Sequence, residues 1–170
     1  NNLILDNPAS ILAMNGISQI SAVSVTSALT SGKLSVGADA LIQTFDHTES
    51  SMVDISDNTS LTIQNVFEVP QNKSMELTGN DNGTLILGDK LTLSGMLIIS
   101  APDKLSGGTL ELKGGTLSIN ENSVIESALT HIDQSSINVI SGKTLKYTGN
   151  EAKIGALELT LSGGGFLDNS

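Results

Sequence analysis

The residue with the widest chemical range in this sequence is His47. It stands in the segment Asp46-His47-Thr48-Glu49, and Asp54 and Asp57 follow it closely. An imidazole together with carboxylates can bind a divalent metal ion. The acidic residues around His47 follow no ligand spacing that is typical of such a site. We therefore expect a solvated loop here and predict no metal site.

Paired carboxylates are the second candidate for chemistry. Glycan hydrolysis needs two carboxyl groups about 5 to 5.5 Å apart in retaining enzymes and about 6.5 to 9.5 Å apart in inverting ones. Neighbouring coils of a parallel β-helix could supply such distances, and Asp54 with Asp57, or Asp81 with Asp89, are the only clusters that we consider for such a site. Sugar sites also use aromatic side chains and Arg, but the sequence has no Trp, one Tyr, three Phe and no Arg. We predict no catalytic residues, and a polysaccharide-cleaving protein stays as the alternative.

Two further patterns point to sites only weakly. Ser is abundant, but no Gly-x-Ser-x-Gly turn presents one as a nucleophile, and His131 is expected on the outward side of a strand. The segment Gly163-Gly-Gly-Phe-Leu-Asp168 resembles the turn of calcium-binding nonapeptide repeats. It occurs once, so we expect a flexible turn and predict no cofactor. Ca²⁺ is the ion that exposed Asp and Asn oxygens would suit best.

The charge of the chain argues against several partners. Eight Lys stand against 18 Asp and Glu, which gives a formal net charge of −10. Such a surface repels a phosphate backbone, so nucleic acid is not expected as a partner. No apolar run is long enough for a membrane span, and the chain has no Cys. This composition favours an extracellular or bacterial cell-surface protein. Because the chain begins with Asn1, we expect it to be processed or part of a longer chain.

The elements that would position these residues are short strands. Residues 83–95 and 108–120 are near-copies, each with two Leu- or Ile-rich alternating runs split by a Gly-containing turn. Alternation with a period of two is the signature of a β-strand. A unit of roughly 25 residues that repeats along a chain is typical of a solenoid, in which each unit buries its apolar face on the next.

Similar runs continue from Leu3 to Leu161 without a capped helical stretch, so an all-β chain is predicted. Apolar positions that recur at a nearly constant interval, Leu34, Leu61, Leu85, Leu110 and Ile137, predict about seven irregular coils. Bulges are expected at residues 45–51 and 69–74. The prediction is a single right-handed parallel β-helix over residues 1–170. A β-sandwich, which also contains many short alternating strands, is the alternative.

The phrase Gly107-Gly-Thr-Leu-Glu-Leu-Lys-Gly-Gly-Thr-Leu-Ser-Ile-Asn120 resembles the glycine-punctuated repeats of autotransporter passengers and of filamentous-haemagglutinin-like adhesins. The good match covers about residues 79–120. These families are exported bacterial β-solenoids that serve as adhesins or fibres. The resemblance therefore implies a secreted or surface-attached structural module.

The function expected from the sequence is a non-enzymatic stiff shaft or fibre segment. Its expected partners are further copies or flanking repeats that cover its ends, and surface glycans. A polysaccharide-binding or polysaccharide-cleaving β-helix is the alternative. The residues expected to point into the core are Leu61, Ile63, Leu85, Leu87, Leu91, Leu93, Leu110, Leu112, Leu117, Ile119, Ile137, Val139, Leu157, Leu159 and Leu161.

Overall fold

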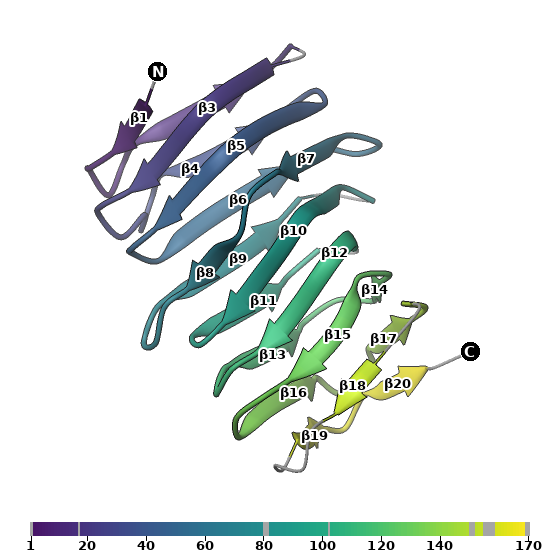
Figure 1. Cartoon of the computed structure of the whole chain (residues 1–170). Helices are drawn as coiled ribbons and strands as arrows, with labels where there is room; N and C mark the ends of the chain where they lie inside the picture. The colour runs from purple at the N-terminus through teal and green to yellow at the C-terminus, as the bar shows by residue number, and fades with distance from the viewer. Residues whose placement is uncertain are drawn as a thin grey trace.

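The computed structural model describes residues 2–16, 18–79, 82–101, 103–149, 152–154 and 159–168. All regular elements in these residues are β-strands, and none of them is a helix. The strands wind into a parallel solenoid of about seven turns, with the two ends of the chain at opposite ends of the stack (Figure 1). The solenoid prediction is confirmed. The sandwich alternative is wrong, because its strands would pair antiparallel.

Two parallel sheets form the walls of the solenoid, and the longer one has twelve strands. Its strands are β1 (Asn2–Leu5), β3 (Ser18–Val25), β5 (Ala40–His47), β7 (Ser60–Ile63), β8 (Phe67–Val69), β10 (Thr84–Leu93), β12 (Lys104–Leu112), β14 (Ser123–Ile125), β15 (Ala128–His131), β17 (Thr144–Tyr147), β18 (Ala152–Ile154) and β20 (Phe166–Asp168). In Figure 1 this sheet lies in front.

The shorter sheet lies behind it and has eight strands, one from each passage of the chain (Figure 1). They are β2 (Ile11–Met14), β4 (Lys33–Val36), β6 (Ser51–Ile55), β9 (Ser74–Thr78), β11 (Met96–Ile99), β13 (Thr116–Ile119), β16 (Ser135–Val139) and β19 (Leu159–Gly163). The chain thus alternates between the two sheets and advances by one strand at each turn.

The longer sheet consists of two columns of paired strand segments. Strands β7 and β8 pair with successive halves of β10, and β14 and β15 pair with successive halves of β12. We call the halves the first and the second column. The first column contains β7, β14, β17, β20 and the first halves of β3, β5, β10 and β12. The second contains β1, β8, β15, β18 and the second halves of those long strands.

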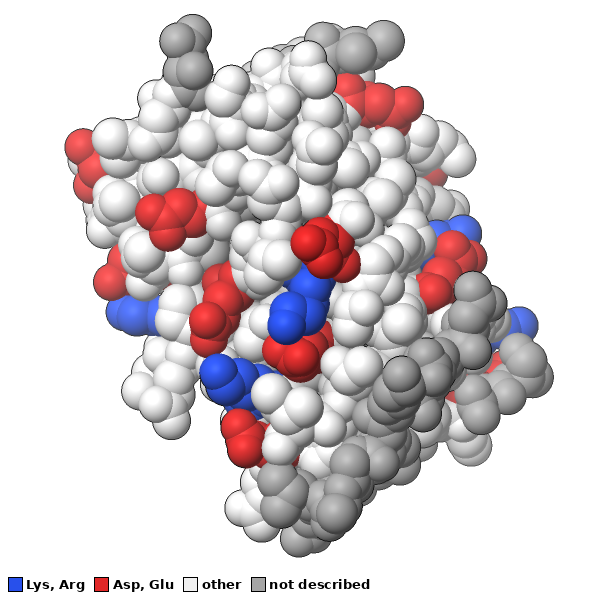
Figure 2. Space-filling model, viewed as in Figure 1, with Lys and Arg blue, Asp and Glu red and all other residues white. Residues whose placement is uncertain are grey.

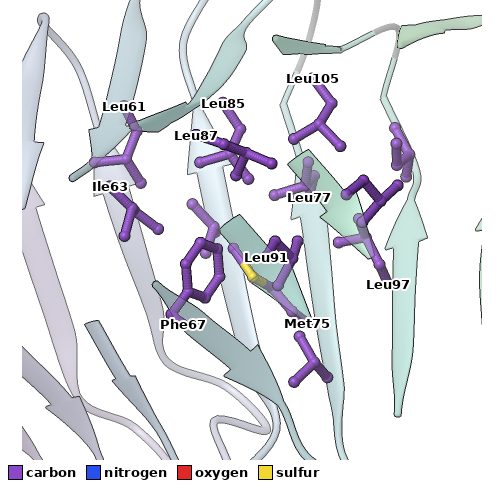
Figure 3. Packing of buried hydrophobic residues seen from close by; sticks show 14 of the residues in the cluster. Leu61, Ile63, Phe67, Met75, Leu77, Leu85, Leu87, Leu91, Leu97 and Leu105 are labelled. Carbon is purple, nitrogen blue, oxygen red and sulfur yellow. The ribbon is translucent and has the colours of Figure 1, made fainter. Parts of the chain in front are cut away.

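A continuous aliphatic core fills the space between the sheets (Figure 3). Side chains alternate between inward and outward along each strand, as the period-two pattern predicts. Twelve of the positions expected to point inward are buried, with exposed fractions of 5% or less. Leu157 and the side chains of Leu159 and Leu161 lie outside the described part of the structure. The prediction of the core is therefore confirmed wherever the structure describes it.

The length of a turn differs from the sequence estimate and varies along the stack. One turn takes the chain from Leu34 to its partner Val53, whereas the longer turn beside it leads from Ser51 to Met75. The spacing rule was wrong because Leu34 and Ile137 belong to the shorter sheet, whereas Leu61, Leu85 and Leu110 belong to the longer one. Leu61 does pair with Leu85, as that rule implied.

The near-copies that suggested the solenoid do not stack in the register that the repeat implies. Residues 84–87 lie beside 104–107, and residues 109–112 lie beside 90–93. The recurring phrase Gly-Thr-Leu-x-Leu or Gly-Thr-Leu-x-Ile is therefore the unit of a strand. It lies on the longer sheet at residues 83–87 and 108–112 and on the shorter sheet at residues 115–119. It does not mark a whole turn.

One of the two expected bulges is wrong. β5 stays paired with β3 as far as His47, opposite Val25, so residues 45–47 form a regular strand. The second is a turn between β8 and β9, closed by the Lys73 N–H donating to the Pro70 carbonyl at 3.1 Å. In that turn Asn72 takes a φ of 63°, a left-handed conformation that Asn tolerates well.

Candidate functional site

Ion pairs between neighbouring turns are the main polar feature of the outer surface. Each pair joins a Lys to an acidic residue of a neighbouring turn, either the one before or the one after it. The pairs are Lys33 with Asp54, Lys73 with Glu49 (2.6 Å), Lys90 with Glu111 (3.0 Å), Lys104 with Glu126 (3.0 Å) and Lys143 with Glu121 (2.5 Å). The face in Figure 2 accordingly has Lys beside acidic side chains.

Glu111 has the densest set of these contacts. Its Oε1 accepts hydrogen bonds from Lys90 Nζ at 3.0 Å and from Thr92 Oγ1 at 3.2 Å. Similar side-chain bonds between turns join Ser94 to Glu68 at 2.6 Å and Ser100 to Glu76 at 2.6 Å. The carboxylates of Glu68, Glu76 and Glu111 thus accept hydrogen bonds from side chains of neighbouring turns, and these bonds hold the turns together.

Open hollows lie on the outer surface, and two of them are large enough to consider. One, of about 560 Å³, lies on the second column, and its lining includes Ser24, Asp46, Val66 and Glu68. The other, of about 480 Å³, has Lys73 and Met96 among its lining residues. A sugar site commonly adds an aromatic platform, but Phe45 and Phe67 of the first hollow are buried, 3% and 4% exposed.

His47 lies inside the core, contrary to the expected solvated loop. It is 3% exposed at the end of β5, and its Nε2 is 2.7 Å from Ser51 Oγ. Burial lowers the pKa of His47 to about 4. The alternation of β5 explains the position, because Phe45 is inward and His47 is two residues further on. A neutral imidazole that is bonded to one Ser fills the core here.

His131 is also buried, at 3% exposed, so the expected surface display is wrong. The error lay in the phase of β15. His131 shares its side with Leu129, which is inward, whereas the following Ile132 is 46% exposed. Neither ring nitrogen of His131 has a hydrogen-bond partner within the described residues.

Only one of the two acidic pairs lies wholly within the described residues. Asp54 is paired with Lys33, and Asp57 lies in the exposed turn after β6. Asp81 lies outside the described residues, while Asp89 is exposed where the register of β10 shifts. The structure therefore leaves the pair Asp81 and Asp89 untested.

The segment that resembles a calcium-binding turn is divided between two strands. Gly163 ends β19, and Asp168 ends β20. Among the described residues, no three His, Cys, Asp or Glu side chains come together in a way that could hold a metal ion. Gly164 and Gly165 form the turn that connects these two strands, where the sequence predicted a turn.

A buried carboxyl group that sequence reasoning missed is Asp103. It is 1% exposed, and its Oδ1 accepts a hydrogen bond from the Gly83 N–H at 3.1 Å, whereas Oδ2 has no partner within the described residues. Burial raises the pKa of Asp103 to about 7, and the charge of Asp54 adds to this rise. The sequence feature that could have pointed to this buried acid is Gly83, which precedes Asp103 by one turn of the chain.

Comparisons with protein-family models, with curated proteins and with solved structures find no match to this chain. The functional conclusion therefore depends on the residues themselves. The described part of the chain contains no helix, and hence none that could span a membrane. What remains is a surface of ion pairs and shallow hollows around an aliphatic core.

Proposed function

We propose that this chain is a non-enzymatic structural or adhesive module, a stiff shaft of a secreted or surface-attached bacterial protein. The observation that carries the proposal is the unbroken aliphatic core, which passes from Leu5 in the first turn to Leu145 and Tyr147 near the last. Backbone hydrogen bonds run along the axis at every strand pair. A rod of this kind resists bending because each turn is bonded to both of its neighbours.

The ion pairs between turns support the same role. Each joins residues one turn apart at the surface, so together they add resistance to sliding between turns. Individual pairs of this exposure contribute only about 0.2 to 1 kcal/mol. Their value to a shaft lies in their distribution along its length, from Lys33 near one end to Lys143 near the other.

Placement at a bacterial surface is supported by sequence features alone. The acidic, Cys-free composition and the glycine-punctuated phrase of residues 107–120 favour an exported β-solenoid of the adhesin type. We expect the winding to be right-handed, because crossovers between parallel strands of one sheet almost always are. Flanking repeats or further copies of the chain are the partners that would cover its ends.

Glycan binding or cleavage is the second candidate. Its support is the hollow on the second column, which places Asp46 and Glu68 on one surface. The assay is depolymerisation of a panel of acidic and neutral polysaccharides, alongside a glycan array. We expect no cleavage of any polymer. Cleavage that is lost in Asp46→Asn or Glu68→Gln, but kept in the exposed control Asp57→Asn, would replace the shaft by an enzyme.

A further inference from the structure

The first and the last turn of the solenoid pass over the same three faces in the same order. The first consists of β1 in the second column, β2 in the shorter sheet and the first half of β3 in the first column. The last consists of β18, β19 and β20, again in the second column, the shorter sheet and the first column. Among the described residues, each of these strand segments has a parallel partner on one side only.

Register positions with the same spacing can be found in these two turns. Most of these strands have more than one position that pairs with a buried residue of the neighbouring turn. In both turns one such position can be taken from each strand so that nine and then six positions separate the three. They are Leu3, Leu12 and Ser18 in the first turn, and Ala152, Leu161 and Leu167 in the last. With this choice of positions, the three strands of one end can pair at once with the three of the other.

Apolar side chains are uncovered at both ends of the described stack. At the first turn Leu3 is 38% exposed, although the buried Val23 is its partner, and Ile4 is 58% exposed. At the last turn Leu167 is 45% exposed, although it pairs with the buried Leu145. A hollow of about 370 Å³ opens there, lined by Leu167 and by residues of β16 and β19 with the turn that follows them. Each end thus presents apolar surface that a further turn could cover.

We propose that a second copy of this chain docks head to tail, with its β1, β2 and first half of β3 pairing with β18, β19 and β20 of the first copy. The inference rests on the proposed function as a shaft and specifies its junction. Parallel pairing satisfies the free backbone groups of both edges and covers Leu3 and Leu167. Since the contact joins two different surfaces, it repeats and gives an open filament.

A head-to-head pair of two first turns is the main competitor, and the geometry argues against it. Two copies of β1 that meet by a two-fold axis run antiparallel, whereas every strand pair in the described residues is parallel. Head-to-tail docking continues the existing parallel ladder on all three faces.

Cysteine cross-linking tests the junction directly, because the chain has no Cys. If Ala152 lies opposite Leu3 of the next copy, Lys153 lies opposite its Ile4. Ile4→Cys and Lys153→Cys variants of the 170-residue chain are mixed and oxidised. We expect a disulfide-linked dimer in the mixture, identified by mass spectrometry as the pair of positions 4 and 153. The exposed variant Thr44→Cys, on β5 and two strands in from the β1 edge, replaces Ile4→Cys in the control mixture and should give no such dimer.

Sedimentation over a wide concentration range gives an independent readout. We expect the wild type to form a concentration-dependent series of polymers. Leu3→Lys should abolish the series, and the mid-shaft control Val66→Lys should keep it, since Val66 is 50% exposed away from both ends. Circular dichroism is compared across all variants to show that each is folded.

Three outcomes would overturn the junction: a folded wild type that stays monomeric at all concentrations, a linked dimer of Ile4→Cys alone, or equal linking in the Thr44→Cys mixture. Linking of Ile4→Cys alone would indicate the head-to-head pair. None of these results touches the shaft proposal, which fails instead if the chain cleaves a polysaccharide.

Discussion

The backbone N–H of Gly83 donates a hydrogen bond to the carboxyl oxygen of Asp103 one turn further on, at 3.1 Å. A Cβ at position 83 would lie 2.9 Å from that oxygen and 2.8 Å from the Cβ of Ile55. The absence of a side chain at Gly83 thus makes the space for a buried acid. The residue type at position 83 in one turn thus determines whether the next turn can hold a buried Asp at position 103.

The free energy of unfolding should fall as the pH rises, because of Asp103. Its pKa is raised from 3.8 to about 7 by burial, so the folded state favours the protonated acid. Stability from this group is fully present below about pH 4 and is lost as the pH rises through 7. Asp103→Asn, measured by denaturant unfolding, should match the wild type at pH 4 and exceed it at pH 8 by an amount on the order of a few kcal/mol. Equal pH profiles for the two proteins would show that Asp103 is ionised in the fold.

Gly83→Ala should destabilise the protein at every pH, because the added methyl group meets the Ile55 backbone and side chain as well as Asp103. We expect a loss of about 1 to 3 kcal/mol, as for other overpacked positions. Gly16→Ala is the matched control, since a Cβ there meets no atom within 4 Å. Thermal melts that rank these two variants alike would contradict the close packing of Gly83 against the neighbouring turn.

Leu110 and Glu111 are consecutive residues of β12 that should respond very differently to substitution. Leu110 is fully buried, so Leu110→Asp places an unpaired carboxylate in a dry core and should cost at least about 4 kcal/mol. Glu111→Ala removes the bonds from Lys90 and Thr92 and should cost about 0.5 to 1 kcal/mol. The measurement is the free energy of unfolding, and the reverse ranking would mean that the inward phase of β12 is wrong.

The ion pairs between turns predict a dependence on salt. Lys90→Met removes the pair with Glu111, whereas Lys113→Met changes a Lys that forms no ion pair within the described residues. We expect only the first variant to lower the melting temperature at low ionic strength. The difference between the two should shrink in about 1 M salt, where the screening length falls to about 3 Å. A difference that is unchanged by salt would indicate lost packing of the Lys90 stem.

The inward phase of most strands could be predicted from the sequence because Leu, Ile and Val alternate so regularly. Leu85, Leu87, Leu91 and Leu93 illustrate this, and all four are buried. The pairing between strands could not be predicted in the same way. The Gly-Thr-Leu-x-Leu or -Ile phrase occurs on both sheets, so its recurrence did not give the turn length. The partner of Leu85 in the next turn is Leu105, and not Leu110 as the repeat implied.

Polar residues on the inside of the solenoid were the other failure of sequence reasoning. His47 was expected in a solvated loop and His131 on the outward side of a strand, whereas Asp103 drew no prediction. All three are buried. The charged residues on the outer surface could have indicated which turns are neighbours. Lys90 and Glu111 are separated by one turn of the chain, and four other pairs of opposite charge are separated in the same way.

The central claim is that the chain forms a shaft whose turns are bonded one to the next, and pulling along the axis tests it most directly. The absence of Cys allows handles to be attached through Asn2→Cys and Asp168→Cys, at opposite ends of the stack (Figure 1). We predict a stiff initial response and then release of chain in steps of one turn or whole multiples of it. For a turn of about 20 residues, each step should be roughly 70 Å at an extended length of about 3.6 Å per residue. Smooth extension at low force, without steps, would contradict the shaft.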